Sequence, residues 1–145
     1  MNHSNKTVCV VGASGLLGSN VLKEALARGY KVNGTLRDVN APGKATFLNA
    51  LPNAETNLRL FEAEMADKAS FDDAFSNADC VFIACLIPVY KGPTGKPARE
   101  MDDEQGYAEI IMPTVNGCLN ILKSAARQGV KNIVICITDI YFMYF

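Results

Sequence analysis

Apolar and polar positions along the chain alternate in blocks that predict strands and helices in turn. Short apolar runs, typical of buried parallel strands, cover residues 7–11, 30–36, 58–63, 80–85 and 131–137. Between them, apolar residues recur at helical spacing after residue 16, around 45–51, over 71–75 and from about 104 to 128. Such alternation implies right-handed crossovers. It predicts an α/β fold, a Rossmann-type doubly wound parallel sheet of about five strands flanked by helices, with order 3-2-1-4-5.

Several of these segments carry boundary signals. The first helix has a cationic last turn and a C-cap glycine at Arg28 and Gly29, and its apolar positions are Leu16, Leu17, Val21, Leu22, Ala25 and Leu26. Residues 67–70 offer N-caps for the short helix over 71–75. The last helix is expected to bend or restart at Pro113, with an apolar stripe on Val115, Cys118, Leu119, Leu122 and Ala126. Residues 86–104 predict a long loop after the fourth strand, where ligand loops sit in open α/β sheets.

Composition restricts the class of protein. With 145 residues, 49% of them hydrophobic, and a mean hydropathy of +0.08, the chain suits one domain with a buried sheet. A net charge of −1 argues against nucleic acid and anionic membranes as partners. The first residues lack the apolar segment of a secretion signal, and no apolar run is long enough for a membrane span, so we expect a cytoplasmic protein. The five cysteines are expected to be buried free thiols: Cys9, Cys80, Cys85, Cys118 and Cys136.

The candidate chemistry lies where the first strand ends. Gly12, Gly15 and Gly18 follow an apolar run and open a helix, which is the spacing of a dinucleotide-phosphate turn. Gly12 would make the tight turn, Gly15 would let the main chain approach the phosphates, and Gly18 would let the helix lie close to the strands. Free N–H groups of that helix, with a contact from Ser14, would face the anion. The alternative is a plain tight turn that binds nothing.

The end of the second strand indicates which dinucleotide is preferred. Arg37 stands at the strand tip, before Asp38. A guanidinium pairs with a 2′-phosphate, whereas a carboxylate accepts hydrogen bonds from ribose hydroxyls. The order favours NADP over NAD. Lys44 either adds a second positive charge to that phosphate or is a solvated surface residue.

Segments spread along the chain resemble one enzyme family: residues 11–18, 28–32, 36–38, 63–65, 70–74, 81–82 and 113–122. They are similar to the extended short-chain dehydrogenase/reductases, in the NAD-dependent epimerase/dehydratase superfamily, and within it to the dihydroflavonol 4-reductase and cinnamoyl-CoA reductase group. The likeness implies an NAD(P)-binding Rossmann domain over residues 7–138, without the C-terminal substrate lobe. Residues 1–6 would be a disordered start and 139–145 a divergent apolar tail.

The resemblance also implies roles for residues outside the glycine turn. Glu64 and Met65 take positions that flank the adenine, although the family has aspartate and leucine there. Ala84 and Cys85 match the strand end beside the nicotinamide ribose, and Leu16 and Leu17, in the glycine-turn segment, are expected to bind the cofactor as well. Thr138 takes the place of the Ser that holds the carbonyl oxygen, or simply ends a strand.

The family's Tyr-x-x-x-Lys pair is absent, because none of the five tyrosines has a lysine four residues later. The family reduces carbonyls or oxidises alcohols, with a nicotinamide dinucleotide and a small carbonyl substrate as partners. We expect cofactor binding with little turnover. The alternatives are a non-catalytic NADP-sensing regulatory protein and a truncated inactive product. With His3 as the single histidine, histidine-based triads and zinc sites are not expected, and no metal is. The sequence leaves substrate and oligomeric state open.

Overall fold

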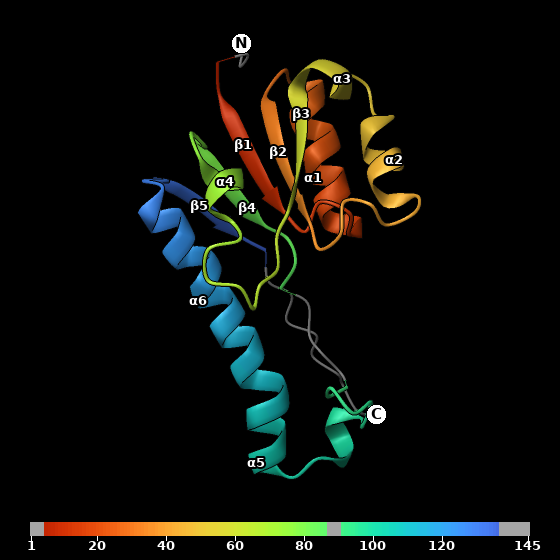
Figure 1. Cartoon of the computed structure of the whole chain (residues 1–145), viewed down its shortest axis with the longest axis vertical. Helices are drawn as coiled ribbons and strands as arrows, with labels where there is room; N and C mark the ends of the chain where they lie inside the picture. The colour runs from red at the N-terminus through yellow and green to blue at the C-terminus, as the bar shows by residue number, and fades with distance from the viewer. Residues whose placement is uncertain (1–4, 87–90, 137–145) are drawn as a thin grey trace, which may run out of the picture.

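A parallel sheet forms the centre of the molecule. The computed structural model describes residues 5–86 and 91–136. Within them the strands are β1 (Thr7–Val11), β2 (Lys31–Leu36), β3 (Leu58–Glu62), β4 (Cys80–Ile83) and β5 (Asn132–Ile135). Their order is β3-β2-β1-β4-β5 and every neighbouring pair is parallel (Figure 1). The predicted Rossmann-type fold and strand order are therefore confirmed.

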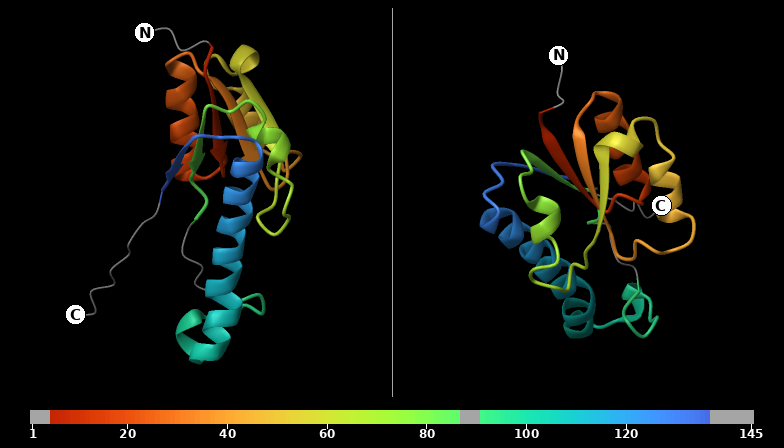
Figure 2. Two further views of the ribbon diagram at one scale, coloured as in Figure 1. Left: turned by 90° about the vertical axis from the view of Figure 1, so that its left-hand side faces the viewer. Right: turned by 45° about the horizontal axis from the view of Figure 1, so that its top comes forward.

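Helices cover the sheet on two sides (Figures 1 and 2). The described helices are α1 (Leu16–Ala27), α2 (Lys44–Asn49), α3 (Ala54–Asn57), α4 (Asp72–Phe75), α5 (Asp103–Gly106) and α6 (Met112–Arg127). A 3₁₀ turn, η1 (Ala98–Glu100), and a π-helical segment, η2 (Tyr107–Ile111), complete them. The pair α1 and α2 lies on one face of the sheet, and α4 and α6 lie on the other. No helix in the described part of the chain is both long and apolar enough to cross a membrane.

The central strand β1 explains why the sequence begins with an unbroken apolar run. Val8 and Val10 pack in the core under α1, and Cys9 and Val11 pack in the core under α4 and α6. All four are at most 6% exposed. Because both faces of a doubly wound sheet are covered, the strand needs apolar residues at successive positions. Burial also raises the pKa of the Cys9 thiol far above its usual range.

The apolar stripe predicted for the last helix is wrong in most of its members, although Leu122 does pack against the core. The residues of α6 that are buried are Gly117, Ile121, Ser124 and Ala125. Val115 and Leu119 are each 42% exposed, and Ala126 is exposed as well. Apolar residues occur on more than one face of this helix. The buried face is the one that meets Met65 at Gly117 and the Asp72 carboxylate at Ser124.

Other boundary predictions also need correction. Leu16 and Leu17 are 87% and 46% exposed, because α1 begins beyond the end of the core. Residues 67–70 do not cap α4, since the Ser70 hydroxyl donates to the Glu64 carbonyl instead, at 2.8 Å. Before Pro113 the helix neither stops nor restarts: α5, η2 and α6 follow one another, with a π-helical stretch just ahead of the proline. All five cysteines are free, but only Cys9 is fully buried.

Candidate functional site

The glycine turn after β1 is held by close backbone contacts. Gly12 has φ +81°, a conformation that favours glycine, and a Cβ there would come within 2.7 Å of the Cys85 Cβ. At Gly18 a Cβ would lie 2.1 Å from the Gly12 carbonyl oxygen. These two glycines are therefore required by the fold, and Gly18 brings α1 against the turn itself.

Gly15 differs from its two neighbours in the motif. Its φ of −74° suits any residue, and the nearest atom to a Cβ there is the Gly12 oxygen at 3.4 Å. The protein alone thus has little need for glycine at this position. Gly15 lines a pocket, so glycine at this position leaves room for a ligand there.

Thr35 fixes the turn from the neighbouring strand. Its hydroxyl accepts a hydrogen bond from the Gly12 amide at 3.3 Å, and its carbonyl accepts one from the Ala13 amide at 3.0 Å. Thr35 is 2% exposed and lies opposite Val11 in the β1–β2 register. Sequence analysis missed this residue. Its signal is the parallel register, which places the last residues of β2 beside the turn.

The N-terminus of α1 offers unbonded backbone donors. Gly15 occupies the N-cap position and no side chain caps the helix. Ser19 is the first helical amide to bond back, to the Gly15 carbonyl at 2.8 Å. Within the described residues, the amides of Leu16, Leu17 and Gly18 have no acceptor. Free amides at the positive end of a twelve-residue helix suit an anionic group.

A pocket of about 370 Å³ lies at the carboxyl ends of β1, β2 and β4. Open α/β sheets bind ligands at this position, the topological switch point where the strand order reverses. Eight of the predicted site residues line this pocket: Gly12, Ser14, Gly15, Arg37, Glu64, Met65, Ala84 and Cys85. Its remaining lining residues are Val11, Thr35, Leu36, Ala63 and Phe71.

The other predicted site residues lie outside the pocket lining. Leu16, Leu17 and Gly18 are in the first turn of α1, and Lys44 is the exposed first residue of α2. Thr138 falls outside the described residues, as does His3. In the described ranges no group of three or more His, Cys, Asp and Glu side chains is arranged to hold a metal ion. Asp102, in the acidic segment 100–104, caps α5 by accepting from the Gln105 amide at 2.8 Å.

The two charged residues after β2 have different environments. Arg37 is exposed and lines the pocket, and no ion pair within residues 5–86 and 91–136 involves it. The Asp38 carboxylate accepts from the Asn40 amide at 2.8 Å and so is directed to its own turn. Asp38 does not line the pocket, so the Arg37 guanidinium is the charged group that faces a ligand in this corner.

The opposite wall is built around Met65. Its carbonyl accepts from the Asn120 side-chain amide at 2.9 Å, and its Cε lies 2.5 Å from where a Cβ on Gly117 would be. The Cys85 thiol lies 3.7 Å from the Met65 sulfur. Burial raises the pKa of the Cys85 thiol to about 11, so this side of the pocket is a packing surface and not a reactive thiolate. Gly117 allows α6 to close this wall.

The loop after β3 is shaped by short polar contacts. The Ser70 hydroxyl bonds both the amide and the carbonyl of Glu64, at 3.1 and 2.8 Å. The Glu64 carboxylate accepts from the Met65 amide at 2.8 Å. Glu64 is thus turned toward its own backbone, and the loop presents Met65 to the pocket.

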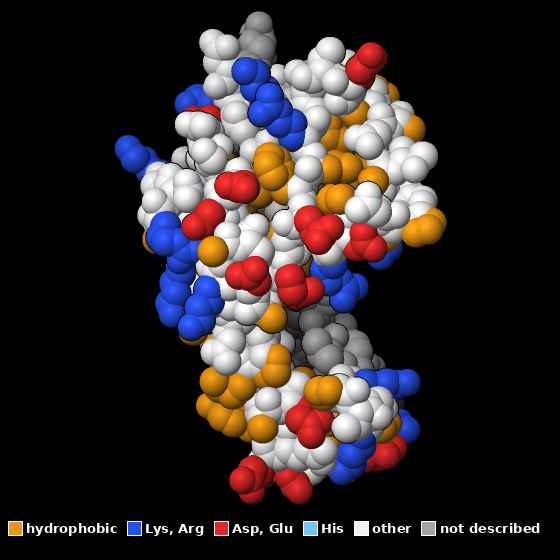
Figure 3. Space-filling model, viewed as in Figure 1, with side chains coloured by type: hydrophobic (Ala, Val, Ile, Leu, Met, Phe, Trp, Pro, Cys, Tyr) orange, Lys and Arg blue, Asp and Glu red, His pale blue; other side chains and the backbone are white. Residues whose placement is uncertain are grey.

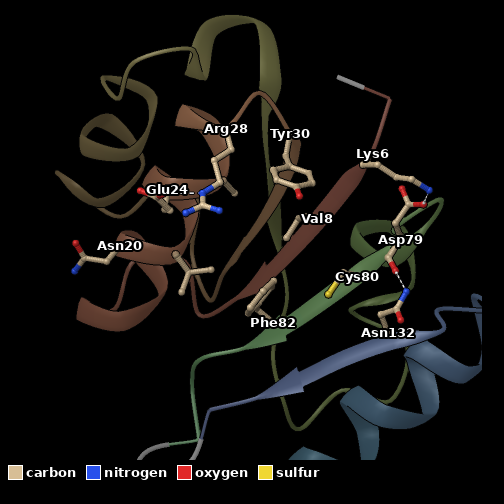
Figure 4. A pocket seen from close by; sticks show the side chains of 12 residues that line it. Lys6, Val8, Asn20, Glu24, Arg28, Tyr30, Asp79, Cys80, Phe82 and Asn132 are labelled. Carbon is tan, nitrogen blue, oxygen red and sulfur yellow. Dashed lines mark hydrogen bonds and ion pairs between the residues drawn. The ribbon is translucent and has the colours of Figure 1, made fainter. Parts of the chain in front are cut away.

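A larger hollow lies elsewhere, on the α1 face of the sheet (Figure 4). Its volume is about 830 Å³, and Val8, Val21 and Phe82 are among the apolar residues that line it. None of the predicted site residues does. Apolar side chains are also exposed along η2 and α6, at Tyr107, Ile111 and Val115. Figure 3 shows hydrophobic side chains gathered on the lower part of the molecule. Size alone therefore does not mark the binding site.

The sequence profile of the NmrA-like family matches residues 4–105, which include the glycine turn, Arg37 and the pocket-lining ends of β3 and β4. The chain belongs to this NmrA-like family.

Relatives of this chain include plant reductases. Dihydroflavonol 4-reductase from Dianthus caryophyllus is 39% identical over 129 residues, which are 89% of this chain and 33% of that enzyme. Among solved structures, vestitone reductase from alfalfa is 31% identical with a TM-score of 0.64, over 89% of this chain and 35% of that one. Gre2 from Candida albicans, solved in complex with NADPH, is 26% identical with a TM-score of 0.65, over 90% and 36%. The chain spans about a third of the length of these proteins.

Proposed function

We propose that this chain is an NADP(H)-binding domain of a dihydroflavonol-reductase-like oxidoreductase. The observation that carries the proposal is the set of unbonded amides at the N-terminus of α1, beside a pocket lined by Gly12, Ser14 and Gly15. These groups would hold the diphosphate. The residues present fit such a group, since Gly15 leaves free the pocket side that a side chain would fill.

Preference for NADP over NAD is attributed to Arg37. Its guanidinium lines the pocket without an ion-pair partner in the described residues, while the neighbouring Asp38 carboxylate is bonded to the Asn40 amide. A free guanidinium matches a 2′-phosphate, and an occupied carboxylate is less able to accept ribose hydroxyls. Lys44 lies outside the pocket lining and would contribute only through its longer-range charge.

The remaining pocket residues are assigned by likeness to the reductases. Glu64 and Met65 would flank the adenine, and Ala84 and Cys85 would lie beside the nicotinamide ribose. The proximity of Met65 to Cys85 supports one continuous apolar wall between these two subsites. The NADPH bound in the related Gre2 structure is consistent with this class of ligand.

Carbonyl reduction is the reaction that we propose for a longer protein in which this chain would be the dinucleotide-binding domain. NADPH supplies a hydride when bound. This chain's contribution is to bind and orient the dinucleotide, with Thr138 proposed to hold the carbonyl oxygen. Its 145 residues contain no Tyr-x-x-x-Lys pair. We therefore expect turnover lower by a factor of roughly 10² to 10⁴ than with a positioned proton donor.

Calorimetric titration with NADPH and NADH tests the proposal. We expect heat of binding with NADPH and weaker binding of NADH, together with little oxidation of NADPH in the presence of aldehydes and ketones. Absence of binding by either nucleotide would contradict the dinucleotide site. Rapid oxidation of NADPH would contradict the expectation that this chain turns over slowly.

A second candidate is a non-catalytic NADP-sensing regulatory protein. The match to the NmrA-like family is compatible with this role, because a sensor needs only the dinucleotide pocket. NADPH binding with no turnover on any carbonyl, combined with a partner that binds only the NADPH-loaded protein, would favour the sensor over the reductase.

A further inference from the structure

Met65 brings a thioether sulfur to the wall of the glycine-turn pocket. The residue is half-buried: it packs against the core cluster under α4 and α6, and it also lines the pocket, where solvent reaches it. The reductases that the sequence resembles have leucine at this position. Methionine fills a similar volume, but its sulfur can be oxidised, which leucine cannot be.

The backbone of Met65 is fixed on both sides of its α-carbon. Its amide donates to the Glu64 carboxylate at 2.8 Å, and its carbonyl accepts from the Asn120 side-chain amide at 2.9 Å. Because Asn120 belongs to α6, the second bond ties the pocket loop to a sixteen-residue helix. This backbone cannot move away from a chemical change in the side chain without breaking one of these bonds.

The Met65 side chain has little room on the side away from the pocket. Its Cε lies 2.5 Å, and its Cβ 3.1 Å, from where a Cβ on Gly117 would be, so α6 lies directly against it. The Cys85 thiol is 3.7 Å from the sulfur and donates toward it. An oxygen atom added to the sulfur would therefore enter the pocket or displace these neighbours.

Of the two sulfurs in this wall, the thioether is the one that a peroxide oxidises near neutral pH. A cysteine reacts as its thiolate, and burial raises the pKa of the Cys85 thiol to about 11, so nearly all of it stays protonated. The thioether of Met65 has no proton to lose, so its reactivity does not depend on pH in this range.

We propose that Met65 is an oxidation site, at which conversion of the thioether to the sulfoxide by hydrogen peroxide weakens dinucleotide binding. An S–O bond forms as the O–O bond of the peroxide breaks, the sulfur loses two electrons, and the peroxide is reduced to water. The product places a polar group in the apolar wall that Met65 shares with Cys85. This inference rests on the proposed dinucleotide site, and it adds a sensitivity to peroxide that leucine would not give.

The first test is calorimetric titration of the 145-residue chain with NADPH, before and after treatment with hydrogen peroxide that is removed before the titration. Peptide mass spectrometry measures the oxidised fraction of Met65. We expect roughly 10-fold weaker binding once Met65 is oxidised. A methionine sulfoxide reductase should restore the affinity, because it reduces the sulfoxide and leaves over-oxidised cysteine unchanged.

Two leucine variants identify the methionine responsible. Met65→Leu should bind NADPH like the wild type and keep that affinity after peroxide treatment, because the volume is retained without the sulfur. The matched control is Met101→Leu, since Met101 is half-buried as well and lies outside the pocket lining. This control should lose affinity on oxidation just as the wild type does.

Met65→Gln imitates the sulfoxide without any oxidant. It places a polar group on an unbranched side chain of similar length, so NADPH should bind roughly 10-fold more weakly than to the wild type. Circular dichroism checks that each variant is folded. Wild-type affinity in a folded Met65→Gln protein would show that the wall tolerates a polar group, and would overturn the proposal.

Two rates separate oxidation at Met65 from general damage. Loss of affinity should proceed equally fast at roughly pH 6 and pH 8, whereas loss through a cysteine would accelerate as thiolate forms. Saturating NADP⁺ should slow oxidation of Met65 and leave that of Met101 unchanged, because the bound dinucleotide would cover the pocket wall. A loss that accelerates with pH, or equal protection of both methionines, would contradict the assignment.

Failure of this inference differs from failure of the dinucleotide site. Complete oxidation of Met65 with unchanged NADPH affinity would overturn the inference and leave the site standing. A Met65→Leu protein that loses affinity on oxidation would do the same, as would a Met65 that stays reduced while Met101 is oxidised. Untreated wild-type protein that binds neither NADPH nor NADP⁺ would contradict the proposed function, and this inference with it.

Discussion

The two edges of the sheet are built differently. At one edge, β3 places the exposed charges of Arg59 and Glu62 within the strand. At the other edge, β5 has no charge and exposes three consecutive apolar residues, from Ile133 to Ile135. Charges on an edge strand disfavour pairing with another chain, whereas a bare apolar edge invites it. The β3 edge is therefore suited to contact with water, whereas β5 presents an apolar surface.

The same division extends to the halves of the sheet behind each edge. The half that contains β1, β2 and β3 is closed over by α1 and α2 and carries the glycine turn, fixed by Thr35. The half that contains β4 and β5 is closed on the α6 face but open on the α1 face. Changes in the closed half should thus affect folding or dinucleotide binding, and changes at β5 should leave dinucleotide binding unchanged, since no β5 residue lines that pocket.

The largest expected effect is at Gly18, in the closed half. Gly18→Val would drive side-chain atoms into the Gly12 carbonyl, which is backbone and has no alternative position. Overpacking of this kind costs about 3 kcal/mol of unfolding free energy. Urea denaturation measures it. A Gly18→Val protein as stable as wild type would mean that α1 does not sit this close to the turn.

The next largest effect is expected at Arg37, where a substitution should change the dinucleotide preference of the closed half without changing its packing. Arg37→Asp should weaken NADPH binding by roughly 10- to 100-fold, since a hydrogen-bonded charge pair is lost. NADH binding should change little. Lys23→Asp, a charge change of the same size on α1 outside the pocket, is the control. Equal losses for both nucleotides would show that Arg37 does not bind the 2′-phosphate.

Gly15→Ala separates binding from folding within the glycine turn. The backbone at this position suits alanine, and its Cβ would lie 3.4 Å from the nearest atom, so the urea midpoint should stay near the wild-type value. NADPH binding should fall roughly 10-fold, because the methyl group would occupy the approach to the diphosphate. An unchanged affinity would remove the argument that this glycine serves a ligand.

The smallest effect is a pH dependence that links both halves. The guanidinium of Arg127 and the Ser124 hydroxyl lower the pKa of Asp72, and Lys6 with the Thr7 amide lowers the pKa of Asp79. A depressed carboxyl pKa stabilises the fold above the unfolded-state value of about 3.9 and loses that stabilisation as pH falls through the folded-state pKa.

Urea midpoints at pH 7, 5 and 3 measure this dependence. We expect little change between pH 7 and 5 and a decrease toward pH 3. Asp72→Asn should lower the midpoint at pH 7 and flatten the decrease. The control is Asp73→Asn, which should behave as wild type because the Asp73 carboxylate is in no ion pair among the described residues. A stability that rises toward pH 3 would contradict these contacts.

Sequence alone predicted the strand order and the glycine turn, because both depend on local signals. The unbroken apolar run of β1 and the glycine spacing after it are local features, and handedness then restricts the topology. The face of α6 was missed, since Val115 and Leu119 are as apolar as Ile121. Which face is buried depends on Met65 and Asp72, which lie far away in the sequence.

The candidate site divides in the same way. Gly12, Arg37 and Cys85 were found because they end strands whose order is predictable. Thr35 was missed, as its role arises only from the register between β1 and β2. Of the two roles left open for Lys44, the exposed position at the start of α2, outside the pocket lining, fits the solvated surface residue. Side-chain roles that depend on pairing between strands need the folded backbone.

The burial of Cys9 at the centre of β1 makes this thiol a natural reporter of global opening. Neither water nor an alkylating reagent reaches it while β1 keeps neighbours on both sides, and burial, which raises its pKa, suppresses the thiolate as long as the sheet stays closed. Its modification rate in dilute urea would therefore count only openings that separate the middle of the sheet. The half-buried thiols of Cys80 and Cys136, near the β5 edge, would record local fraying in the same sample.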